Sequence, residues 1–229
     1  MTENQKLKME LLKQFAISDE PKTIEVCRQM YKFMVEDEGQ APASKPDTKQ
    51  LKDGVYYVTT DGMAIPYSAV LTPPEDLKGV GVVMGERSII VALTESPASE
   101  ETKLTTRKDP SDLKGNYIEK CIDAVADWNG RENTEHLKAV GLSDNIHLED
   151  GQYIPSMGEM YLIYLNRKAI NEALEKADGQ PIADDWYWTS TECSATNAWT
   201  LHLCYGGLMY LNAKASTTYR VRPVSAFIS

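Results

Sequence analysis

The side chains that most often carry out chemistry in proteins, those of His and Cys, are few and scattered in this chain. They are His136, His147, His202, Cys27, Cys121, Cys193 and Cys204. No C-x-x-C pair occurs and no His stands at ligand spacing, so the thiolate set that a tetrahedral zinc site needs is missing. We expect no metal site and free thiols, with a Cys193–Cys204 disulfide as the alternative.

Other signatures of catalysis are missing from the sequence as well. No Ser stands in a nucleophile-elbow sequence, and no glycine-rich loop is spaced to cradle a phosphate. His136 and His147 fall in a polar region that is typical of surface residues. The sequence therefore predicts a protein that is not an enzyme and uses no cofactor.

One segment, Asp123–Asn133, is rich in side-chain oxygens. It contains Asp127, Asn129, Glu132 and Asn133. Such oxygens are calcium ligands, although their spacing here differs from that of an EF-hand loop. The same residue types form caps and turns, so a cation site and a turn-forming role both stay open.

Aromatic residues are densest near the C-terminus, at Trp186, Tyr187, Trp188 and Trp199. Large aromatics dominate the packing of small domains. We therefore expect Trp188 and Trp199 in the core and Trp186 at its rim.

The residues around Trp199 alternate in a way that predicts a strand. Large apolar residues take every second position over Trp199–Leu203. Because alternate side chains of a strand leave the core, the row Thr200, His202 and Cys204 is expected to face outward. A mixed outward row is typical of a recognition surface, in which Tyr gives rigid contact area and small polar residues adapt. The predicted ligand-binding residues are Ser194, Thr196, Asn197, Thr200, His202, Cys204, Tyr205, Leu208, Tyr210, Asn212, Ser216, Thr217 and Tyr219.

Composition limits the partners. The 229-residue chain carries a net charge of −10, and nucleic-acid affinity rests on clustered Lys and Arg, so no nucleic-acid partner is expected. No apolar run approaches the roughly 20 residues that span a bilayer, which predicts no membrane insertion. The N-terminus shows no signal peptide. The protein is then kept in a cytoplasm, released by lysis as a virion component is, or exported by a signal that was removed.

Two amphipathic helices are predicted near the N-terminus. Leu7, Leu11 and Phe15 recur every fourth residue over 3–17, and a second apolar stripe follows over Lys22–Asp37. Helices this short bury too little surface alone. We expect them to attach the chain to a larger particle or to drive homo-oligomerisation.

The chain is therefore expected to have three parts. Residues 1–38 form the N-terminal helical segment, the linker-like residues 39–52 follow, and residues 53–229 form the ligand-binding domain.

Within the domain, strand patterns stand at both ends and helix patterns between them. Two hairpins are predicted, one turning at Asp61-Gly62 and one at Gly85-Glu86-Arg87. Helical spacing then follows over Tyr117–Trp128, Asn133–Val140 and Gly158–Ala177. Gly179 supplies the expected C-terminal glycine of the last helix. With strands again from Trp186 onward, the pattern indicates an α+β domain.

Several blocks of this domain resemble one family. They are Tyr153–Met160 (Y-I-P-S-M-G-E-M), Tyr187–Glu192 (Y-W-T-S-T-E), Ala198-Trp199, Gly207 and Arg220–Phe227 (R-V-R-P-V-S-A-F). Together they resemble the C-type lectin fold of the formylglycine-generating-enzyme type, as found in gut-bacterial and phage surface proteins. In particular, the chain resembles the variable proteins of diversity-generating retroelements. The resemblance covers roughly residues 50–229 and is strongest over 150–229.

The resemblance implies a rigid scaffold that displays a variable-type region over about 187–227. In that family the usual ligand is a protein or glycan on a host or target cell, and the protein lies on a phage virion or a cell surface. Undiversified relatives share the framework blocks. An undiversified structural or adhesin subunit of the same fold is therefore the alternative.

One feature of the sequence matches diversification. Template adenines are randomised in such systems, so Asn codons ending in a pyrimidine change only to residues with codons ending in C or T. The predicted outward residues obey this limit. Met209 and Lys214 violate it, and both are expected in the framework.

Two other activities of the fold find less support. Calcium-dependent sugar lectins carry Glu-Pro-Asn or Gln-Pro-Asp motifs, and neither occurs here. Oxidases of the formylglycine-generating type use active-site cysteines in a C-terminal context unlike Arg220–Phe227. An oxidase of that type is the second alternative.

Overall fold

The computed structural model describes residues 51–107, 113 and 115–227. The chain divides into two units, Met1–Thr48 and Lys49–Ser229, and all described residues belong to the second unit. The helices expected over 3–17 and Lys22–Asp37, most of the 39–52 linker and Cys27 lie outside the described residues.

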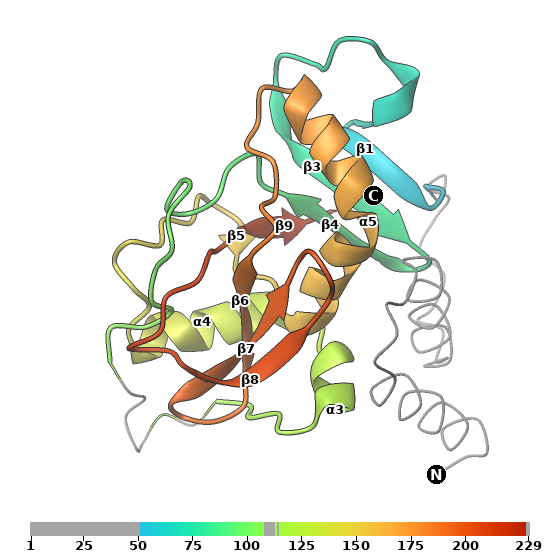
Figure 1. The fold of residues 1–229 in the computed structure, drawn as a ribbon. Coiled ribbons are helices and arrows are strands. Elements are labelled where there is room, and N and C mark those ends of the chain that lie inside the picture. The colour runs from blue at the N-terminus through green and yellow to red at the C-terminus, as the bar shows by residue number, and fades with distance from the viewer. Residues whose placement is uncertain (1–50, 108–112, 114, 228–229) are drawn as a thin grey trace, which may run out of the picture. The chain divides into compact units, whose positions relative to one another are not determined.

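The described residues form two antiparallel sheets and three α-helices (Figure 1). The larger sheet has the order β2-β1-β3-β4-β9-β5 and the smaller sheet the order β6-β7-β8. The larger sheet contains β1 (Gly54–Thr59), β2 (Ala64–Pro66), β3 (Leu77–Met84), β4 (Arg87–Val91), β5 (Gln152–Tyr153) and β9 (Val224–Ala226). The smaller sheet contains β6 (Trp186–Glu192), β7 (Asn197–His202) and β8 (Leu208–Ala213). The helices are α3 (Cys121–Val125), α4 (Gly130–Val140) and α5 (Met157–Lys176), with a short 3-10 helix η1 (Tyr67–Ala69). The predicted α+β class is confirmed.

Both predicted hairpins form in the larger sheet. β1 pairs with β2 across a turn in which Gly62 has a φ of 90°. β3 pairs with β4 so that Met84 lies opposite Arg87, and Gly85 in the turn has a φ of 59°. The left-handed backbone favours glycine at both turns, which is why the turn signals located these hairpins correctly.

The helix predicted over Tyr117–Trp128 is wrong in length, because only Cys121–Val125 is helical. The residues before it are held extended by the smaller sheet. The Ile118 N–H donates to the Glu192 carbonyl, and the Trp199 indole N–H donates to the Ile118 carbonyl. These tertiary hydrogen bonds outweigh the local helical spacing.

The longest helix, α5, begins with a complete capping box. The Ser156 side chain accepts from the Glu159 N–H, and the Glu159 carboxylate accepts from the Ser156 N–H. At the other end Asp178, not Gly179, takes the left-handed conformation, with a φ of 51°. The Gly179 N–H then donates to the Leu174 carbonyl, as in a Schellman motif.

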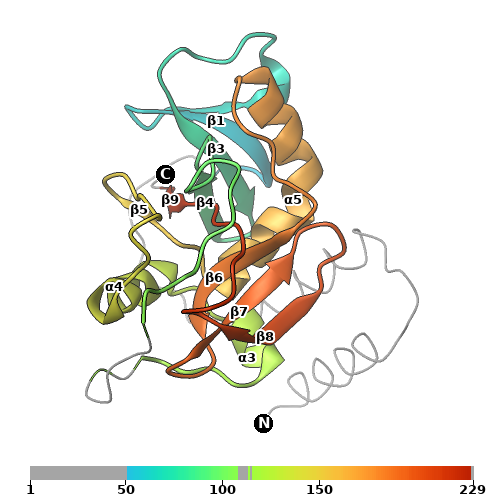
Figure 2. The same cartoon turned by 60° about the vertical axis from the view of Figure 1, so that its left-hand side comes forward.

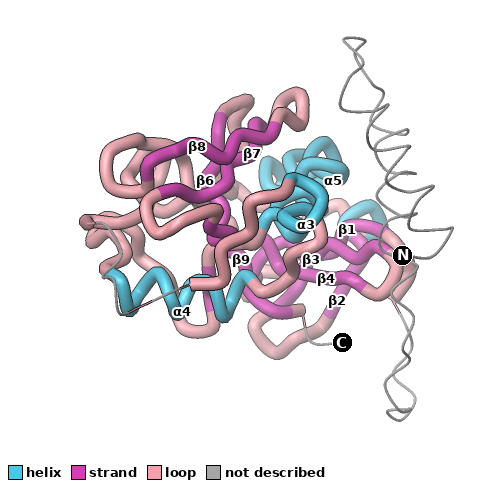
Figure 3. The backbone as a smooth tube through the Cα atoms, turned by 90° about the horizontal axis from the view of Figure 1, so that it is seen from below, coloured by secondary structure: helices cyan, strands magenta, loops and turns pink. Residues whose placement is uncertain are grey.

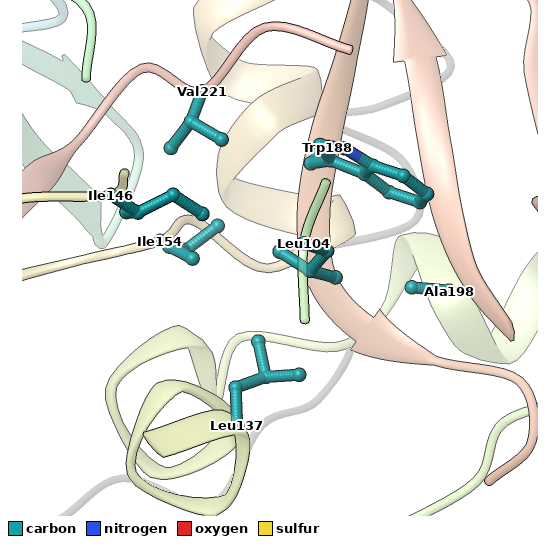
Figure 4. Packing of buried hydrophobic residues seen from close by; sticks show 7 residues of the cluster. All are labelled: Leu104, Leu137, Ile146, Ile154, Trp188, Ala198 and Val221. Atoms are coloured by element: carbon teal, nitrogen blue, oxygen red, sulfur yellow. The ribbon is translucent and has the colours of Figure 1, made fainter. Parts of the chain in front are cut away.

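Helix α5 contacts β1 and β3 of the larger sheet and β6 and β7 of the smaller sheet (Figure 2). In Figure 3, strands β6, β7 and β8 of the smaller sheet lie apart from strands β1 to β4 of the larger sheet. A core cluster next to the smaller sheet, formed by Leu104, Leu137, Ile146, Ile154, Trp188, Ala198 and Val221, is shown in Figure 4. Trp188 stands among these aliphatic side chains, so its expected core position is confirmed.

Candidate ligand-binding surface

A continuous series of aromatic side chains runs from the core to the surface beside the smaller sheet. We call Trp188, Tyr219, Trp186, His202 and Tyr205, in that order, the aromatic row. Ring centroids of successive members lie 5.0, 6.1, 5.1 and 4.1 Å apart. Trp188 is fully buried, whereas Tyr205 is 62% exposed. Because aromatic contacts at these separations are favourable, the aromatic row links the exposed Tyr205 ring to the buried Trp188 side chain and holds it in place.

The strands and the β7–β8 turn position the outer members of the row. Cross-strand pairing sets Trp186 of β6 opposite His202 of β7. The Tyr205 ring then stacks on His202 with an interplanar angle of 23°. The Cys204 N–H donates to Nδ1 of His202 over 3.2 Å, and burial lowers the pKa of that imidazole.

Two glycines make room for the exposed ring. Gly206 has a φ of 72°, and a Cβ at this position would lie 2.8 Å from the Tyr164 ring. A Cβ at Gly207 would lie 2.3 Å from Cε2 of Tyr205. Gly206 therefore lets the turn lie against Tyr164, and Gly207 leaves room for the Tyr205 ring.

A network of buried and half-buried charges centres on Glu95. The Arg220 guanidinium donates to Glu95 over 2.9 Å and to Asp185 over 3.0 Å. The Tyr187 hydroxyl also donates to Glu95, and Arg222 lies 3.6 Å from the same carboxylate. Burial raises the pKa of Tyr187 and lowers that of Arg222. These contacts give the Arg220–Phe227 block a structural role.

A second buried charge cluster joins β6 to the end of β8. Lys214 forms an ion pair with Glu192, and both side chains are almost fully buried. His136 lies 3.3 Å from the same carboxylate, so it is less exposed than expected, whereas His147 is exposed as predicted. Lys214 is a framework residue, as predicted.

The oxygen-rich segment forms hydrogen bonds within the protein. Asp127 accepts from the backbone and side chain of Asn129 over 3.0 Å, from Asn133 over 2.8 Å and from Thr191 over 2.6 Å. Among the described residues no group of three or more His, Cys, Asp or Glu side chains is placed to hold a metal ion. The contacts of Asp127 support the turn-forming alternative.

The Tyr153–Met160 block is also structural. The Tyr153 hydroxyl donates to Glu159 over 2.8 Å, and the Ser156 hydroxyl donates to the Asp127 carbonyl over 2.7 Å. A Cβ at Gly158 would lie 2.6 Å from that same carbonyl oxygen. Burial raises the pKa of Glu159 to about 7.

The predicted outward orientation is wrong for Thr200 and Asn212, which are buried. The Asn212 amide donates to the Thr200 hydroxyl over 2.8 Å and accepts from the Tyr219 hydroxyl over 2.9 Å. β7 is the central strand of its sheet, and Tyr219 covers one of its faces while α5 contacts the other. Simple alternation fails where both faces of a strand are covered.

The remaining predicted residues fall into two groups at opposite ends of β7. Cys204 and Tyr205 are exposed in the β7–β8 turn, with His202 and Tyr219 half-buried beside them. Asn197 begins β7 at the other end, and Ser194, Thr196, Ser216 and Thr217 lie in the adjoining loops. At about 3.3 Å per residue, the six-residue strand separates the two groups by roughly 17 Å. A ligand that contacts both groups must therefore be extended over this distance.

Strand β8 differs most from the prediction. Leu208 is half-buried and Tyr210 is 46% exposed, with its ring 5.2 Å from that of Trp199. Met209, expected in the framework, is 39% exposed, and Leu211 is 67% exposed. β8 is an edge strand, and its pairing with β7 shifts register opposite Trp199, so the exposed residues do not alternate. The sequence alone indicated neither feature.

The cysteines that the structure describes are free thiols at Cys121, Cys193 and Cys204, so the disulfide alternative is wrong. Cys193 is buried, and its thiol donates to the Tyr210 carbonyl over 2.7 Å. None of the helices in the described ranges is both long enough and apolar enough to cross a membrane.

Comparisons with known proteins give a distant structural likeness. No protein-family model and no curated protein matches the chain. Among solved structures, a fimbrial protein from Bacteroides ovatus ATCC 8483 is similar with a TM-score of 0.54 and 17% identity. The match covers 76% of this chain and 48% of the fimbrial protein, about half of its length. At this identity the likeness concerns the fold alone.

Proposed function

We propose that this domain is a recognition module displayed on a phage virion or a cell surface, where it binds a protein or glycan of a host or target cell. The observation that carries the proposal is the aromatic row, with the exposed Tyr205 ring stacked on His202 and anchored through Trp186. Binding energy concentrates in rigid aromatic side chains that need little ordering when the ligand arrives. An exposed ring that is already held by its neighbours fits this requirement.

The finer proposal is a C-type lectin fold of the formylglycine-generating-enzyme type, and a variable protein of a diversity-generating retroelement. The framework blocks support it, because their residues make the buried contacts that hold the smaller sheet. The codon limit is obeyed at the exposed Cys204, Tyr205 and Tyr210 but violated at the exposed Met209. The codon pattern therefore supports diversification at the β7–β8 turn more than along β8.

The binding role can be tested with fluorescently labelled full-length chain on a panel of intact bacterial and animal cells and on a glycan array. Tyr205→Ala is expected to lower affinity for any bound cell or glycan by at least tenfold, as a hot-spot residue would. Tyr67→Ala is the matched control, since Tyr67 lies in η1, away from the aromatic row. Equal binding by Tyr205→Ala and the wild-type protein would refute the proposed site.

Diversification has its own test in the DNA that flanks the gene. A reverse-transcriptase gene with a template repeat of the C-terminal coding segment is expected there. If neither the reverse-transcriptase gene nor the template repeat were found, the proposal of diversification would be refuted, and an undiversified recognition module of the same fold would be the better interpretation.

The likeness to a fimbrial protein favours a second candidate, a structural or adhesin subunit of a surface filament. In that case the smaller sheet packs against a neighbouring subunit. Incorporation of the purified chain into filaments, unaffected by Tyr205→Ala, would support this candidate over receptor binding.

A further inference from the structure

One face of the smaller sheet gathers side chains that carry no formal charge. We call Trp186, His202, Tyr205, Met209 and Tyr219 the uncharged face. Cross-strand pairing sets Trp186 opposite His202 and Met209 opposite Thr200. Alternate residues of a strand share a face, and so do residues directly opposite each other in an antiparallel pair. Met209 therefore lies on the same side of the sheet as the aromatic row.

The lack of charge extends over the whole segment that carries this face. The chain has 24 Lys and Arg residues and 34 Asp and Glu residues, yet Cys193–Tyr219 contains no Arg, Asp or Glu. Its one Lys, Lys214, is buried in the ion pair with Glu192. Burial also lowers the pKa of His202, so this imidazole is neutral at pH 7. The uncharged face therefore gives a charged ligand neither an ion-pair partner nor electrostatic steering.

Charged residues stand at the edge of this face and are bonded there. Asp185, next to Trp186 in the chain, accepts from the Arg220 guanidinium over 3.0 Å. Glu101 accepts from the Thr218 hydroxyl over 2.9 Å. An uncharged centre with a polar rim is typical of protein–protein interfaces, whose centres are depleted of charge and enriched in Trp, Tyr and Met.

Polar groups beside the uncharged face are engaged within the protein. The Asn212 amide donates to the Thr200 hydroxyl over 2.8 Å, and its oxygen accepts from the Tyr219 hydroxyl over 2.9 Å. Nδ1 of His202 accepts from the Cys204 N–H. A glycan brings many hydroxyl groups, and each one that is buried needs a hydrogen-bond partner. Polar side chains that are bonded to each other favour an apolar ligand surface over a sugar.

We propose that the uncharged face docks an uncharged, apolar patch on a target protein. The inference rests on the proposed recognition function and narrows its ligand from a protein or glycan to a protein. Tyr205 supplies a ring that His202 already holds. Met209 is 39% exposed and supplies a flexible side chain that adapts to the shape of the partner. Binding then depends on burial of apolar surface and changes little with salt.

Substitutions of opposite charge at Met209 test this contact on the full-length labelled chain and a cell type that it binds. Met209→Lys and Met209→Glu are both expected to lower the affinity about tenfold or more, because either charge is buried without a partner. The apolar Met209→Leu is expected to stay within about threefold of the wild-type affinity. Leu71→Lys and Leu71→Glu are the matched controls, because Leu71 is 98% exposed and lies outside the smaller sheet. Thermal unfolding checks that each variant is folded.

Treatment of the same cells identifies the class of ligand. Protease digestion is expected to abolish binding of the wild-type chain, whereas periodate oxidation of glycans is expected to leave it unchanged. The affinity is expected to change less than about twofold between roughly 0.05 and 0.5 M NaCl, because screening acts on charges.

Four outcomes would overturn the inference. They are a gain of affinity with one charge at Met209 and a loss with the other, unchanged affinity in both charged variants, a steep dependence on salt, and loss of binding after periodate. Loss of binding in Tyr205→Ala would still support the proposed function in each of these cases. Equal binding by Tyr205→Ala and the wild-type protein refutes the proposed site itself.

Discussion

The C-terminal segment contains two regions that use polar and aromatic residues in opposite ways. Around Glu95, the half-buried Arg220 and the buried Arg222 share one buried carboxylate. In the β7–β8 turn, Tyr205 is mostly exposed and contacts the protein through His202. The first region holds the end of the chain to the domain, and the second presents a side chain to solvent.

The two regions lie close together in the sequence but differ in how much a substitution is expected to destabilise the fold. Substitutions in the buried network leave a charge without a partner, which is costly, whereas substitutions at exposed turn positions cost little. The exposed turn therefore tolerates substitutions that the buried network does not.

The largest loss of stability is expected for Glu95→Ala. The variant leaves Arg220, Arg222 and the Tyr187 hydroxyl without their shared acceptor, so the free energy of unfolding should fall by about 3–5 kcal/mol. Urea denaturation measures the change, with the exposed Glu100→Ala as control, expected within about 0.5 kcal/mol. If Glu95→Ala lost no more stability than the control, the hydrogen bonds and ion pairs around Glu95 would not be what stabilises this region.

The next effect concerns pH and Glu159. Its pKa is about 7 in the fold, above the ordinary value of 4.5, because burial disfavours the carboxylate. Between these values the folded protein retains a proton that the unfolded chain releases. The stability that this group contributes is thus fully present below pH 4.5 and is lost as pH rises through 7, about 3 kcal/mol in total. In Glu159→Gln the free energy of unfolding should change less between pH 4.5 and pH 8 than in the wild-type protein. The same pH dependence in both proteins would contradict the assignment of this effect to Glu159.

The two turn glycines should behave differently from each other. Gly206→Ala forces a side chain into a left-handed backbone against Tyr164 and is expected to cost about 1–2 kcal/mol. Gly207→Ala meets only the movable Tyr205 ring and should cost less than about 1 kcal/mol. It should, however, lower ligand affinity as Tyr205→Ala does. Denaturation and binding measured on both variants test the pair, and unchanged binding by Gly207→Ala would mean that the ring position is unimportant.

The smallest effects on stability are expected at the exposed turns. Tyr205→Ala loses one stacking contact and should cost less than about 1 kcal/mol, and Thr196→Ala should cost less than about 0.5 kcal/mol. Thermal unfolding measures both. Losses as large as that of Glu95→Ala would show that the recognition surface is itself part of the framework.

Local patterns predicted the parts of the fold that local interactions decide. The hairpins turning at Gly62 and Gly85 and the helix beginning after Ser156 follow from turn glycines and a capping box, which are short-range signals. The orientation of Thr200 could not be predicted in this way. Whether an alternate residue faces solvent depends on what covers the strand, and the cover comes from Tyr219 and α5.

The candidate site was predicted in part for the same reason. Its residue types pointed to the C-terminal segment, and His202, Tyr205 and Tyr219 do lie together. The role of Trp186 in joining them depends on strand register and was not visible in the sequence. The pairing of Glu95 with Arg220 joins residues on distant segments, and no local pattern reports it.

The position of β9 has a consequence for how the domain is made. This strand, the last of the described residues, lies between β4 and β5 inside the larger sheet. During translation that sheet stays incomplete until Val224–Ala226 have left the ribosome. A stop codon or frameshift anywhere in the preceding recognition segment removes β9 together with the surface it follows. Only chains read in frame through the whole segment contain β9, so only those chains can complete the larger sheet.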